Sequence, residues 1–405
     1  MIGRTRLVCP GGLNPLNLHP GQRILIVAPH PDDEVLACAG LIQRALALGG
    51  QVRVVYVTAG DGSWPPAWRV TGNMLPSRED YLELGRVRMK EALAGAETLG
   101  LGPNQLKFLG YPDTNLAGLW QRDWQAPCRS SHTGALADPY GGGGSEYTGD
   151  RLLRDILAEL DAVRPDCVFG PHPLDAHADH WSTAMFIAIA REARRRPATE
   201  PFPEVYGYLI HRPPYPDAQI DGSGLLSPPD DLTGANHHWF AHPLDDAQRR
   251  KKQRALGCHD SQRGVIGGDI HSSVAANELF DRLEVADGPV TEDAPQVGFV
   301  PAVRLSSVQV AVRGESLNVE LRSEAGSSSG FEYSFFAHSL EFGPDGVSHG
   351  GLSAGLTPDP TAGPQTWSVN VPWNRRPGQS VLLYSAGVRW GTVSLNHSGL
   401  GRIAG

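Results

Sequence analysis

The sequence predicts an α/β protein with a Rossmann-like, mostly parallel sheet and flanking helices, followed by a C-terminal antiparallel domain similar to a β-sandwich. Up to about residue 285, apolar runs of strand length alternate with segments of helical periodicity, which is the pattern of βαβ units. Beyond it the helical periodicity stops, and runs rich in Val, Leu, Phe and Ser alternate with Gly and Pro turns. We therefore expect two domains in the 405-residue chain, residues 1–285 and 286–405.

The first βαβ unit shows the pattern most clearly. An apolar run at 23–28 precedes a helical stripe that begins at Val35 and ends before Gly49 and Gly50, and a second apolar run follows at 52–60. Further strands are expected at 106–110, 166–170 and 205–210, and further helices at about 78–99, 150–163 and 181–195.

The sequence of the C-terminal region predicts strands and no helices. They are expected at 303–312, 317–324, 331–338, 366–373 and 380–390. These runs carry no clustered His, Asp or Glu, so we expect this domain to fold on its own and to serve substrate placement or stability instead of chemistry.

Composition and charge narrow the classes of partner. A net charge of -9 and a pI near 5.9 give no general attraction to nucleic acid, so no nucleic-acid partner is expected. The five cysteines include no C-x-x-C pair, which argues against a disulfide scaffold and a cysteine zinc site. No stretch has the roughly 18 apolar residues of a membrane span, and the chain start lacks an apolar segment of signal-peptide length. A cytoplasmic protein is expected, or an exported one if a signal peptide has been removed; the oligomeric state is not predicted.

A polar stretch, "HPDDE", follows the first expected strand and opens the first helix. It contains His30, Asp32, Asp33 and Glu34. One aspartate there would make a good N-cap, which is the structural alternative, but three acids after a histidine exceed what a cap requires. The carboxyl ends of parallel strands form the crevice in which α/β sheets bind ligands.

A second polar cluster, "HPLDAHADHW" at 172–181, also lies between an expected strand and a helix, at the same edge of the sheet. Imidazole nitrogen and carboxylate oxygen are the usual ligands of a catalytic zinc, which takes three protein groups and leaves a position open. His30, Asp33 and one histidine of this cluster would make such a site. A lone histidine is more often structural, but two clusters at adjacent strand ends favour a metal.

These motifs resemble a known family. "PHPDDE" at 29–34 and "HADH" at 177–180 are similar to the PIG-L/LmbE family of zinc-dependent N-acetylglucosaminyl deacetylases, and "TAGDG" at 58–62 and "YPDTNL" at 111–116 add to the resemblance. It covers roughly residues 22–285. It implies a hydrolase that uses Zn²⁺, or another divalent metal, to remove the N-acetyl group from an N-acetylglucosamine-type amino sugar or its conjugate.

The resemblance also implies roles for single residues. It gives three zinc ligands, His30, Asp33 and His180. Asp32 matches the general base, and His177 matches a histidine that steadies the developing oxyanion or protonates the leaving amine. Arg88 and Asp113 match positions that contact the sugar. One position departs: Asp175 stands where relatives of the mycothiol type carry a tyrosine, so the oxyanion role of that tyrosine is absent or filled by another group.

Other polar residues keep two interpretations each. Glu34 is either a partner of the helix dipole or a support for a ligand histidine. His259 either reaches the site as a support or substrate group, or is a solvated or capping histidine. His237 and His238 are either extra ligands or loop residues.

Aromatic residues gather in or near two long connections, 63–80 and 130–150, which are candidates for functional loops. They are Trp64, Trp68, Trp120 and Trp124. They form either an aromatic platform for a sugar ring or loop packing.

Two alternatives to the deacetylase stay open. One is a metal-dependent hydrolase of another amide or an ester, and the other is a non-catalytic carbohydrate-binding protein on the same fold. A missing ligand or base would favour the binding protein, but His30, Asp32, Asp33 and His180 are all present.

Overall fold

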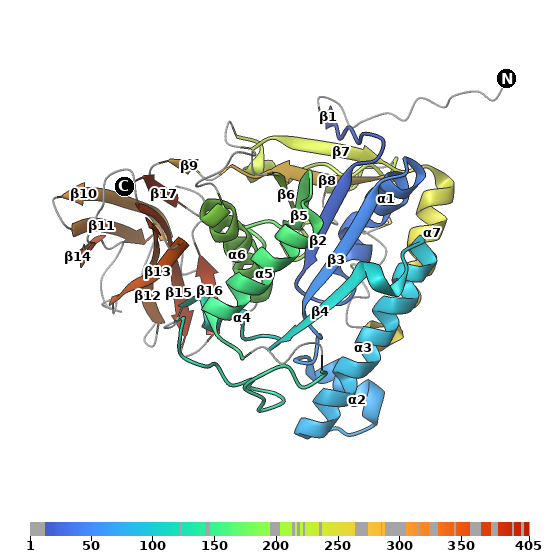
Figure 1. Cartoon of the computed structure of the whole chain (residues 1–405), viewed down its shortest axis with the longest axis horizontal. Helices are drawn as coiled ribbons and strands as arrows, with labels where there is room; N and C mark the ends of the chain where they lie inside the picture. Colours follow the sequence, from blue (N-terminus) through green and yellow to red (C-terminus); the bar gives the residue numbers. More distant parts are fainter. Residues whose placement is uncertain are drawn as a thin grey trace.

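A computed structural model of the chain shows a three-layer α/β domain followed by strands alone (Figure 1). The structure describes residues 13–121, 124–141, 146–194, 203–212, 215–216, 219–221, 223–234, 237–263, 274–284, 286–287, 305–313, 316–323, 331–343, 346–356, 366–373, 380–390, 393–397 and 401–404. The chain start at 1–12, on which the signal-peptide expectation rests, lies outside these residues.

The central sheet has eight strands in the order β1-β7-β8-β6-β5-β2-β3-β4. Their bounds are β1 Asn14–Pro15, β2 Arg23–Ala28, β3 Gln51–Thr58, β4 Leu106–Tyr111, β5 Cys167–Pro171, β6 Glu204–Tyr208, β7 Trp239–Pro243 and β8 Asn277–Arg282. The five strands from β4 to β6 pair in parallel, and β8 pairs antiparallel with both β6 and β7. The predicted mostly parallel, Rossmann-like sheet is therefore confirmed.

Helices cover both faces of this sheet. Their bounds are α1 Asp33–Ala47, α2 Trp64–Thr71, α3 Arg78–Leu99, α4 Leu116–Gln121, α5 Gly149–Val163, α6 Ala178–Arg194 and α7 Asp246–Leu256. Along β2, Ile24 and Ile26 pack with α1, α3 and α7, while Leu25 and Val27 pack with α4, α5 and α6. Because neighbouring residues of a strand point to opposite faces, each central strand supplies both cores.

The strand order reverses between β2 and β5. From β2 the chain proceeds outward through β3 to β4, whereas β5 lies on the other side of β2 and continues to β6. A reversal of this kind opens a crevice at the carboxyl ends of the two strands. The "HPDDE" stretch follows β2 and the "HPLDAHADHW" stretch follows β5, so both begin at this crevice.

Most expected elements occur within a few residues of their predicted bounds, and three differences matter. The connection 63–80 contains helix α2, which the sequence reading missed because two prolines follow Trp64; prolines are compatible with a first helical turn. Helix α6 begins at Ala178, three residues before the expected start, so His180 lies in its first turn. Strands β1, β7 and β8, which form one side of the central sheet, were not expected.

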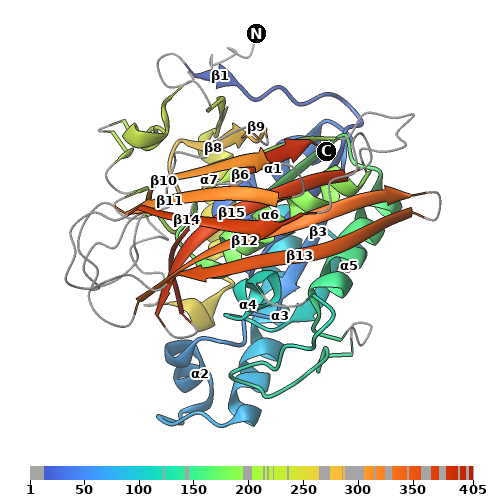
Figure 2. The same ribbon diagram turned by 90° about the vertical axis from the view of Figure 1, so that its left-hand side faces the viewer.

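The C-terminal region forms two further sheets, as Figure 2 shows. A three-stranded sheet has the order β10-β11-β14, and a six-stranded sheet has the order β13-β12-β15-β17-β9 with β16 beside β15. The bounds are β9 Ala286–Asp287, β10 Leu305–Arg313, β11 Ser316–Ser323, β12 Phe331–Gly343, β13 Gly346–Leu356, β14 Thr366–Pro372, β15 Ser380–Trp390, β16 Val393–His397 and β17 Gly401–Ala404. Among the described residues of these two sheets, all strand pairs are antiparallel except β9 with β17.

These sheets agree with the expected antiparallel C-terminal region, and all five expected strands are present. Leu317, Val319 and Leu321 alternate along β11 and are fully buried, as one inward face requires. Residue 285, at the expected domain boundary, lies outside the described residues, so that boundary stays a prediction. None of the helices in the described part of the chain combines the length and hydropathy that a membrane crossing requires.

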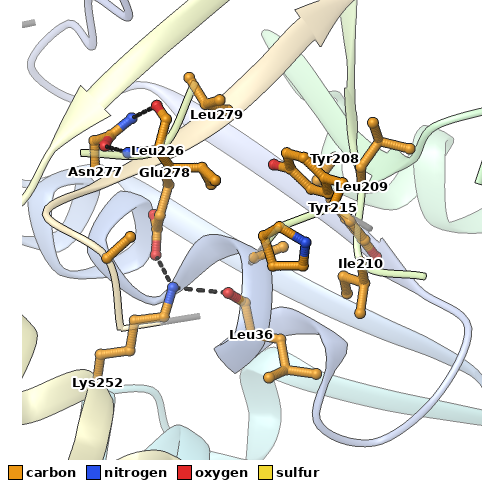
Figure 3. Close-up of a pocket in the computed structure, with 13 residues that line it drawn as sticks. Leu36, Tyr208, Leu209, Ile210, Tyr215, Leu226, Lys252, Asn277, Glu278 and Leu279 are labelled. Carbon is orange, nitrogen blue, oxygen red and sulfur yellow. Dashed lines mark hydrogen bonds and ion pairs between the residues drawn. The ribbon is translucent and has the colours of Figure 1, made fainter. Parts of the chain in front are cut away.

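A buried ion pair holds α1 against α7 and β8. The Lys252 ammonium donates to Glu278 at 2.9 Å and to the Leu36 carbonyl at 2.7 Å, and the Glu278 carboxylate accepts from the Gly40 and Leu41 amides at 2.9 and 3.0 Å. Figure 3 shows this pair at the wall of a largely apolar pocket. Since α1 begins at Asp33, within the polar stretch, the ion pair also anchors the helix to which that stretch leads.

We expect Lys252→Met to lower the free energy of unfolding by about 3–5 kcal/mol, because it leaves the Glu278 carboxylate buried without its cation. Replacing Glu278 by Gln in addition should recover much of the loss. Chemical denaturation measures both effects, with Arg86→Met at the exposed Arg86–Glu83 pair as the control, expected to cost less than about 1 kcal/mol. Equal losses for Lys252→Met and Arg86→Met would contradict the anchoring role.

Candidate metal centre and active site

Four strand ends bring the candidate residues together. His30 follows β2, Asp113 follows β4, the "HADH" stretch follows β5 and opens α6, and His211 follows β6. All lie at the carboxyl edge of the sheet, around the reversal between β2 and β5. Residues that are far apart in the sequence therefore lie together in one largely buried cluster of side chains.

Three ligand-type atoms face one another at nearly equal distances. His180 Nε2 lies 3.3 Å from His30 Nδ1 and 3.4 Å from Asp33 Oδ2, and His30 Nδ1 lies 3.4 Å from Asp33 Oδ2. Two ligands bonded at 2.0–2.1 Å in a tetrahedral arrangement lie about 3.3–3.4 Å apart, so this triangle has the size that a zinc ion needs. We call these three atoms the ligand triangle.

The outer nitrogen of His30 identifies its tautomer. His30 Nε2 lies 3.2 Å from Asp113 Oδ1 and 3.3 Å from Asp179 Oδ2. Carboxylates only accept, so this nitrogen carries the proton and the lone pair of Nδ1 points into the triangle. A carboxylate behind a ligand histidine is the usual way to orient the ring and raise its basicity.

His180 has the same arrangement in the opposite sense. Its outer Nδ1 lies 3.4 Å from Asp175 Oδ2, and its Nε2 faces the triangle. Asp175 also accepts from the backbone amides of His177, Ile210 and His211 at 2.9, 3.0 and 3.1 Å. The residue that departs from the mycothiol-type pattern thus ties the β5 loop to the β6 loop behind His180.

The donor set fits a divalent cation. With both outer nitrogens facing carboxylates, the triangle presents three electron-rich atoms to one another, and a cation relieves their repulsion. Burial alone would lower the pKa of His30, but Asp113, Asp179 and Asp33 outweigh it and raise that pKa well above its usual value. This surplus of negative charge is what a bound cation would neutralise.

Asp32 occupies the N-cap position of α1, but its side chain does not cap the helix as the structural alternative suggested. Its side chain makes no cap hydrogen bond, and its carboxylate instead accepts from Arg88 at 3.1 Å. Its backbone has φ 140°, a conformation that costs a non-glycine residue on the order of 1–3 kcal/mol. Burial, helped by Asp33 and opposed by Arg88, raises the pKa of Asp32 to about 7. A strained, buried carboxylate beside the triangle is suited to accept a proton.

The Glu34 side chain contacts the strained backbone at Asp32. One of its oxygens accepts from the Asp32 backbone amide at 3.2 Å, and burial raises the pKa of Glu34 to about 8. No contact between Glu34 and a histidine is found among the described residues, so the interpretation as a support for a ligand histidine is not favoured. Glu34 lies in the first turn of α1, but a carboxyl with a pKa of about 8 is mostly uncharged at pH 7, so the helix-dipole interpretation stays a prediction.

His177 presents a proton to the pocket. Its Nδ1 accepts from the Asp179 backbone amide at 3.2 Å, so the proton of the neutral ring is on Nε2. Burial and the neighbouring His30 and His180 hold the pKa of His177 well below its usual value. The ring centroid lies 4.9 Å from that of His30 and 5.1 Å from that of His180.

Arg88 and Asp113 have protein partners at the site. The Arg88 guanidinium donates to the Pro31 and Gly60 carbonyls at 3.0 and 3.1 Å besides Asp32, and Asp113 accepts from the Gly62 amide at 2.6 Å. The glycines of "TAGDG" allow these contacts, since a Cβ on Gly62 would lie 2.9 Å from the Asp113 carboxyl carbon. Arg88 thus contacts Asp32 and Asp113 contacts His30, and the expected contacts of both residues with a sugar stay predictions.

His259 is neither solvated nor a cap. It is buried, makes no cap hydrogen bond and lies against α3, where a Cβ on Gly95 would come within 2.9 Å of its Nε2. Burial and the nearby Arg88 lower the pKa of His259 to about 3. Its role as a support or substrate group stays a prediction.

Two residues that the sequence reading did not select lie at the site. Asp179, between the two histidines of "HADH", faces His30. His211 lies with its ring centroid 4.8 Å from that of His180 and 5.2 Å from that of His177. A signal for His211 was available, because it directly follows an expected strand whose carboxyl end points to the same edge of the sheet.

His237 and His238 belong to a separate cluster. Asp281 accepts from His237 Nδ1 at 2.5 Å, from His172 Nε2 at 3.3 Å and from the His238 amide at 2.6 Å. Leu174 donates to His172 Nδ1 at 3.0 Å, which leaves the proton on Nε2 for Asp281. Two ligand atoms 2.5 Å apart are too close for one zinc ion, so we interpret this cluster as hydrogen-bonded structure.

The four tryptophans separate into two pairs. Trp64 and Trp68 stack on α2 at 5.7 Å and are 44% and 43% exposed, whereas Trp120 and Trp124 are buried. Only the first pair is accessible as an aromatic platform. The second pair is the loop packing of the other interpretation.

Comparison with known proteins finds a family match over part of this chain. The PIG-L family model, described as GlcNAc-PI de-N-acetylase, matches residues 25–190. Residues 25–190 form a PIG-L family domain. The resemblance inferred from "PHPDDE" and "HADH" is confirmed, since both motifs lie within this PIG-L domain.

Relatives of the PIG-L domain are named as deacetylases. The 1D-myo-inositol 2-acetamido-2-deoxy-alpha-D-glucopyranoside deacetylase of Nakamurella multipartita is 26% identical over 278 residues, 65% of this chain and 87% of that protein. The protein of the same name from Mycolicibacterium smegmatis is 29% identical over 192 residues, 44% of this chain and 57% of that protein. These names support the prediction of an N-deacetylase, a hydrolase. Among solved structures, the A40926 pseudoaglycone deacetylase Dbv21 aligns at 19% identity with a TM-score of 0.41, over 65% of this chain and 97% of that chain.

The ligand triangle predicts about one divalent metal ion per chain, lost in His30→Ala and His180→Ala because each removes one of three ligands. Elemental analysis of the purified protein measures this. His237→Ala is the matched control, a buried histidine of the other cluster, and should keep its metal. Metal that stays in both triangle variants but leaves the control would move the site to the Asp281 cluster.

Proposed function

We propose that the chain is a zinc-dependent N-deacetylase, able to use another divalent metal, that removes the acetyl group from an N-acetylglucosamine-type amino sugar or its conjugate. The observation that carries the proposal is the ligand triangle, with distances of 3.3–3.4 Å, beside two candidate proton-transfer groups, Asp32 and His177. The names of the relatives support the substrate class.

The triangle residues would hold the ion: His30 through Nδ1, His180 through Nε2 and Asp33 through Oδ2. The bound ion supplies Lewis acidity, which polarises the acetyl carbonyl and makes a water molecule more acidic. Three protein ligands leave room for these oxygen groups. The chain itself supplies the proton transfers.

Asp32 would act as the general base. Its carboxylate is adjacent to the ligand Asp33 but points to Arg88, which lies outside the triangle. Arg88 holds the carboxylate in place and favours its ionised form, which can accept the proton of the attacking water. The unusual backbone conformation of Asp32 lets the two neighbouring carboxylates point to different partners: Asp33 to the triangle and Asp32 to Arg88.

His177 would stabilise the carbonyl oxygen as negative charge develops on it. Its Nε2–H is a donor because Nδ1 is committed to the Asp179 amide, and the low pKa of His177 keeps it neutral. A neutral donor fixed before reaction costs no reorganisation when the charge appears. The acetamide carbon gains the water oxygen, the proton that Asp32 has accepted passes to the departing nitrogen as the C–N bond breaks, and the products are acetate and the free amine of the sugar.

Free amine and acetate should appear in equal amounts when the metal-loaded protein is incubated with N-acetylglucosamine conjugates, and a chelator should abolish both. A panel of conjugates with different aglycones, analysed by amine detection, measures this. Acetate release from simple esters but from no N-acetyl sugar would replace the proposal by an esterase. Tight sugar binding with no product would indicate a binding protein.

Asp32→Asn should lower kcat by about 10²–10⁴-fold with metal content near that of the wild type, because only the proton acceptor is lost. Asp33→Ala should lose metal and activity together. Stopped-assay kinetics and elemental analysis on the same preparations measure both. A metal site emptied by Asp32→Asn but not by Asp33→Ala would reverse the roles.

The pH profile gives a further check on Asp32. A base must be ionised, so kcat/KM of the wild type should fall as the pH drops through the pKa of Asp32. That pKa is about 7 without a cation, and a nearby positive charge lowers it, so the fall should lie below pH 7. Asp32→Asn should lack this acid limb. If kcat/KM of Asp32→Asn still fell at low pH as in the wild type, the fall would be caused by another titrating group.

A further inference from the structure

A side chain of the C-terminal sheets packs against two tryptophans of the PIG-L domain, whose own ring centroids lie 5.7 Å apart. His338 of β12 is 3% exposed, and its ring centroid lies 4.0 Å from that of Trp120 and 4.7 Å from that of Trp124. Both views show β12 and its neighbouring strands beside α4 (Figures 1 and 2). The two regions therefore pack through a specific aromatic contact.

The two tryptophans connect α4 to the helix that carries a triangle residue. Trp120 and Trp124 lie 5.5 and 4.9 Å from Phe186 of α6, measured between ring centroids. His180 opens the same helix six residues earlier. His338 thus contacts a cluster that joins α4 and α6.

The start of α4 is bonded to the support of the other triangle histidine. The backbone amides of Thr114 and Leu116 donate to the two oxygens of Asp179 at 2.6 and 3.0 Å. The oxygen that accepts from Thr114 also faces His30 Nε2 at 3.3 Å. The position of α4 therefore decides where the Asp179 carboxylate lies behind His30.

We infer that His338 is a positioning residue through which the C-terminal sheets hold α4, and with it Asp179 and His30, in the geometry of the metal centre. The inference rests on the metal centre of the proposed function. It gives the C-terminal sheets a part in the reaction that their lack of clustered acid and histidine residues did not indicate.

The physical basis is packing. The His338 ring lies against both indoles and fills space into which α4 would otherwise relax, since protein interiors tolerate few voids. Removing it lets the start of α4 shift, and Asp179 then follows the two amides that it binds. A shift of the carboxylate behind a ligand histidine weakens the ligand, typically by about 10–100-fold in metal affinity or activity when the support itself is removed.

The test compares full-length His338→Ala and His338→Phe with the wild type. His338→Ala should bind zinc about 5–10-fold more weakly in competition with a chelator, because it acts one step behind a direct support. It should change the visible absorption of the cobalt-loaded protein, and kcat should fall more than KM changes. His338→Phe keeps a ring against both indoles and should stay within about 2-fold of the wild type. Equal losses in both variants would overturn packing as the cause.

A double-mutant cycle tests the route through Asp179. Asp179→Asn alone should weaken zinc binding by about 10–100-fold, and adding His338→Ala to it should have little further effect. Fully additive losses would show that His338 acts by another route and would overturn the inference.

Ser339→Ala is the matched control. Ser339 is the next residue of β12, buried on the opposite side of the strand, where its hydroxyl accepts from Trp373 at 3.2 Å. Ser339→Ala should leave zinc affinity unchanged. If it weakened zinc binding as much as His338→Ala does, the effect would come from general loosening of the sheets, and the inference would be overturned. Wild-type protein that binds neither zinc nor cobalt would refute the metal centre itself, whereas wild-type binding unaffected by His338→Ala refutes only the coupling.

Discussion

Three electron-rich atoms held face to face inside the protein are the constraint on which the rest of this site depends. His30 Nδ1, His180 Nε2 and Asp33 Oδ2 lie 3.3–3.4 Å apart, and carboxylates behind both rings direct the lone pairs inward. Such an arrangement is unfavourable alone and favourable around a cation. The fold must therefore hold it rigidly, and the surrounding contacts do so.

Rigidity comes from the sheet reversal and from short polar contacts between neighbouring loops. The β2 and β5 ends meet because the strand order changes direction there, which no local sequence signal could impose. Asp175 then ties the β5 loop to the backbone after β6, and Asp113 ties His30 to the loop after β3. Each carboxylate satisfies buried amides and orients a ring at the same time.

The sequence predicted those features that depend on local periodicity or on a compact motif. The strand at 23–28 and the helix at 78–99 agree with the observed bounds, since hydrophobic period and caps are local properties. The triangle residues were selected because they lie in two short motifs. The partners of Arg88 and the burial of His259 depend on how α3 packs across the β2 and β3 ends, and spacing along the chain carries no information about that. The strained φ of Asp32 was equally hidden, because an aspartate before a helix is normally a cap.

Asp179 shows how far the influence of the triangle extends. Asp179 lies between the two histidines of the "HADH" motif. Its carboxylate links two parts of the molecule. One side of it faces His30, and the other binds the amides that begin α4. Through Trp120 that helix contacts His338 of the C-terminal sheets, more than 200 residues from the first ligand and outside the PIG-L match at 25–190. A carboxylate shared between the His30 ring and a helix start would make the proposed metal centre sensitive to packing that lies outside the domain that carries its ligands.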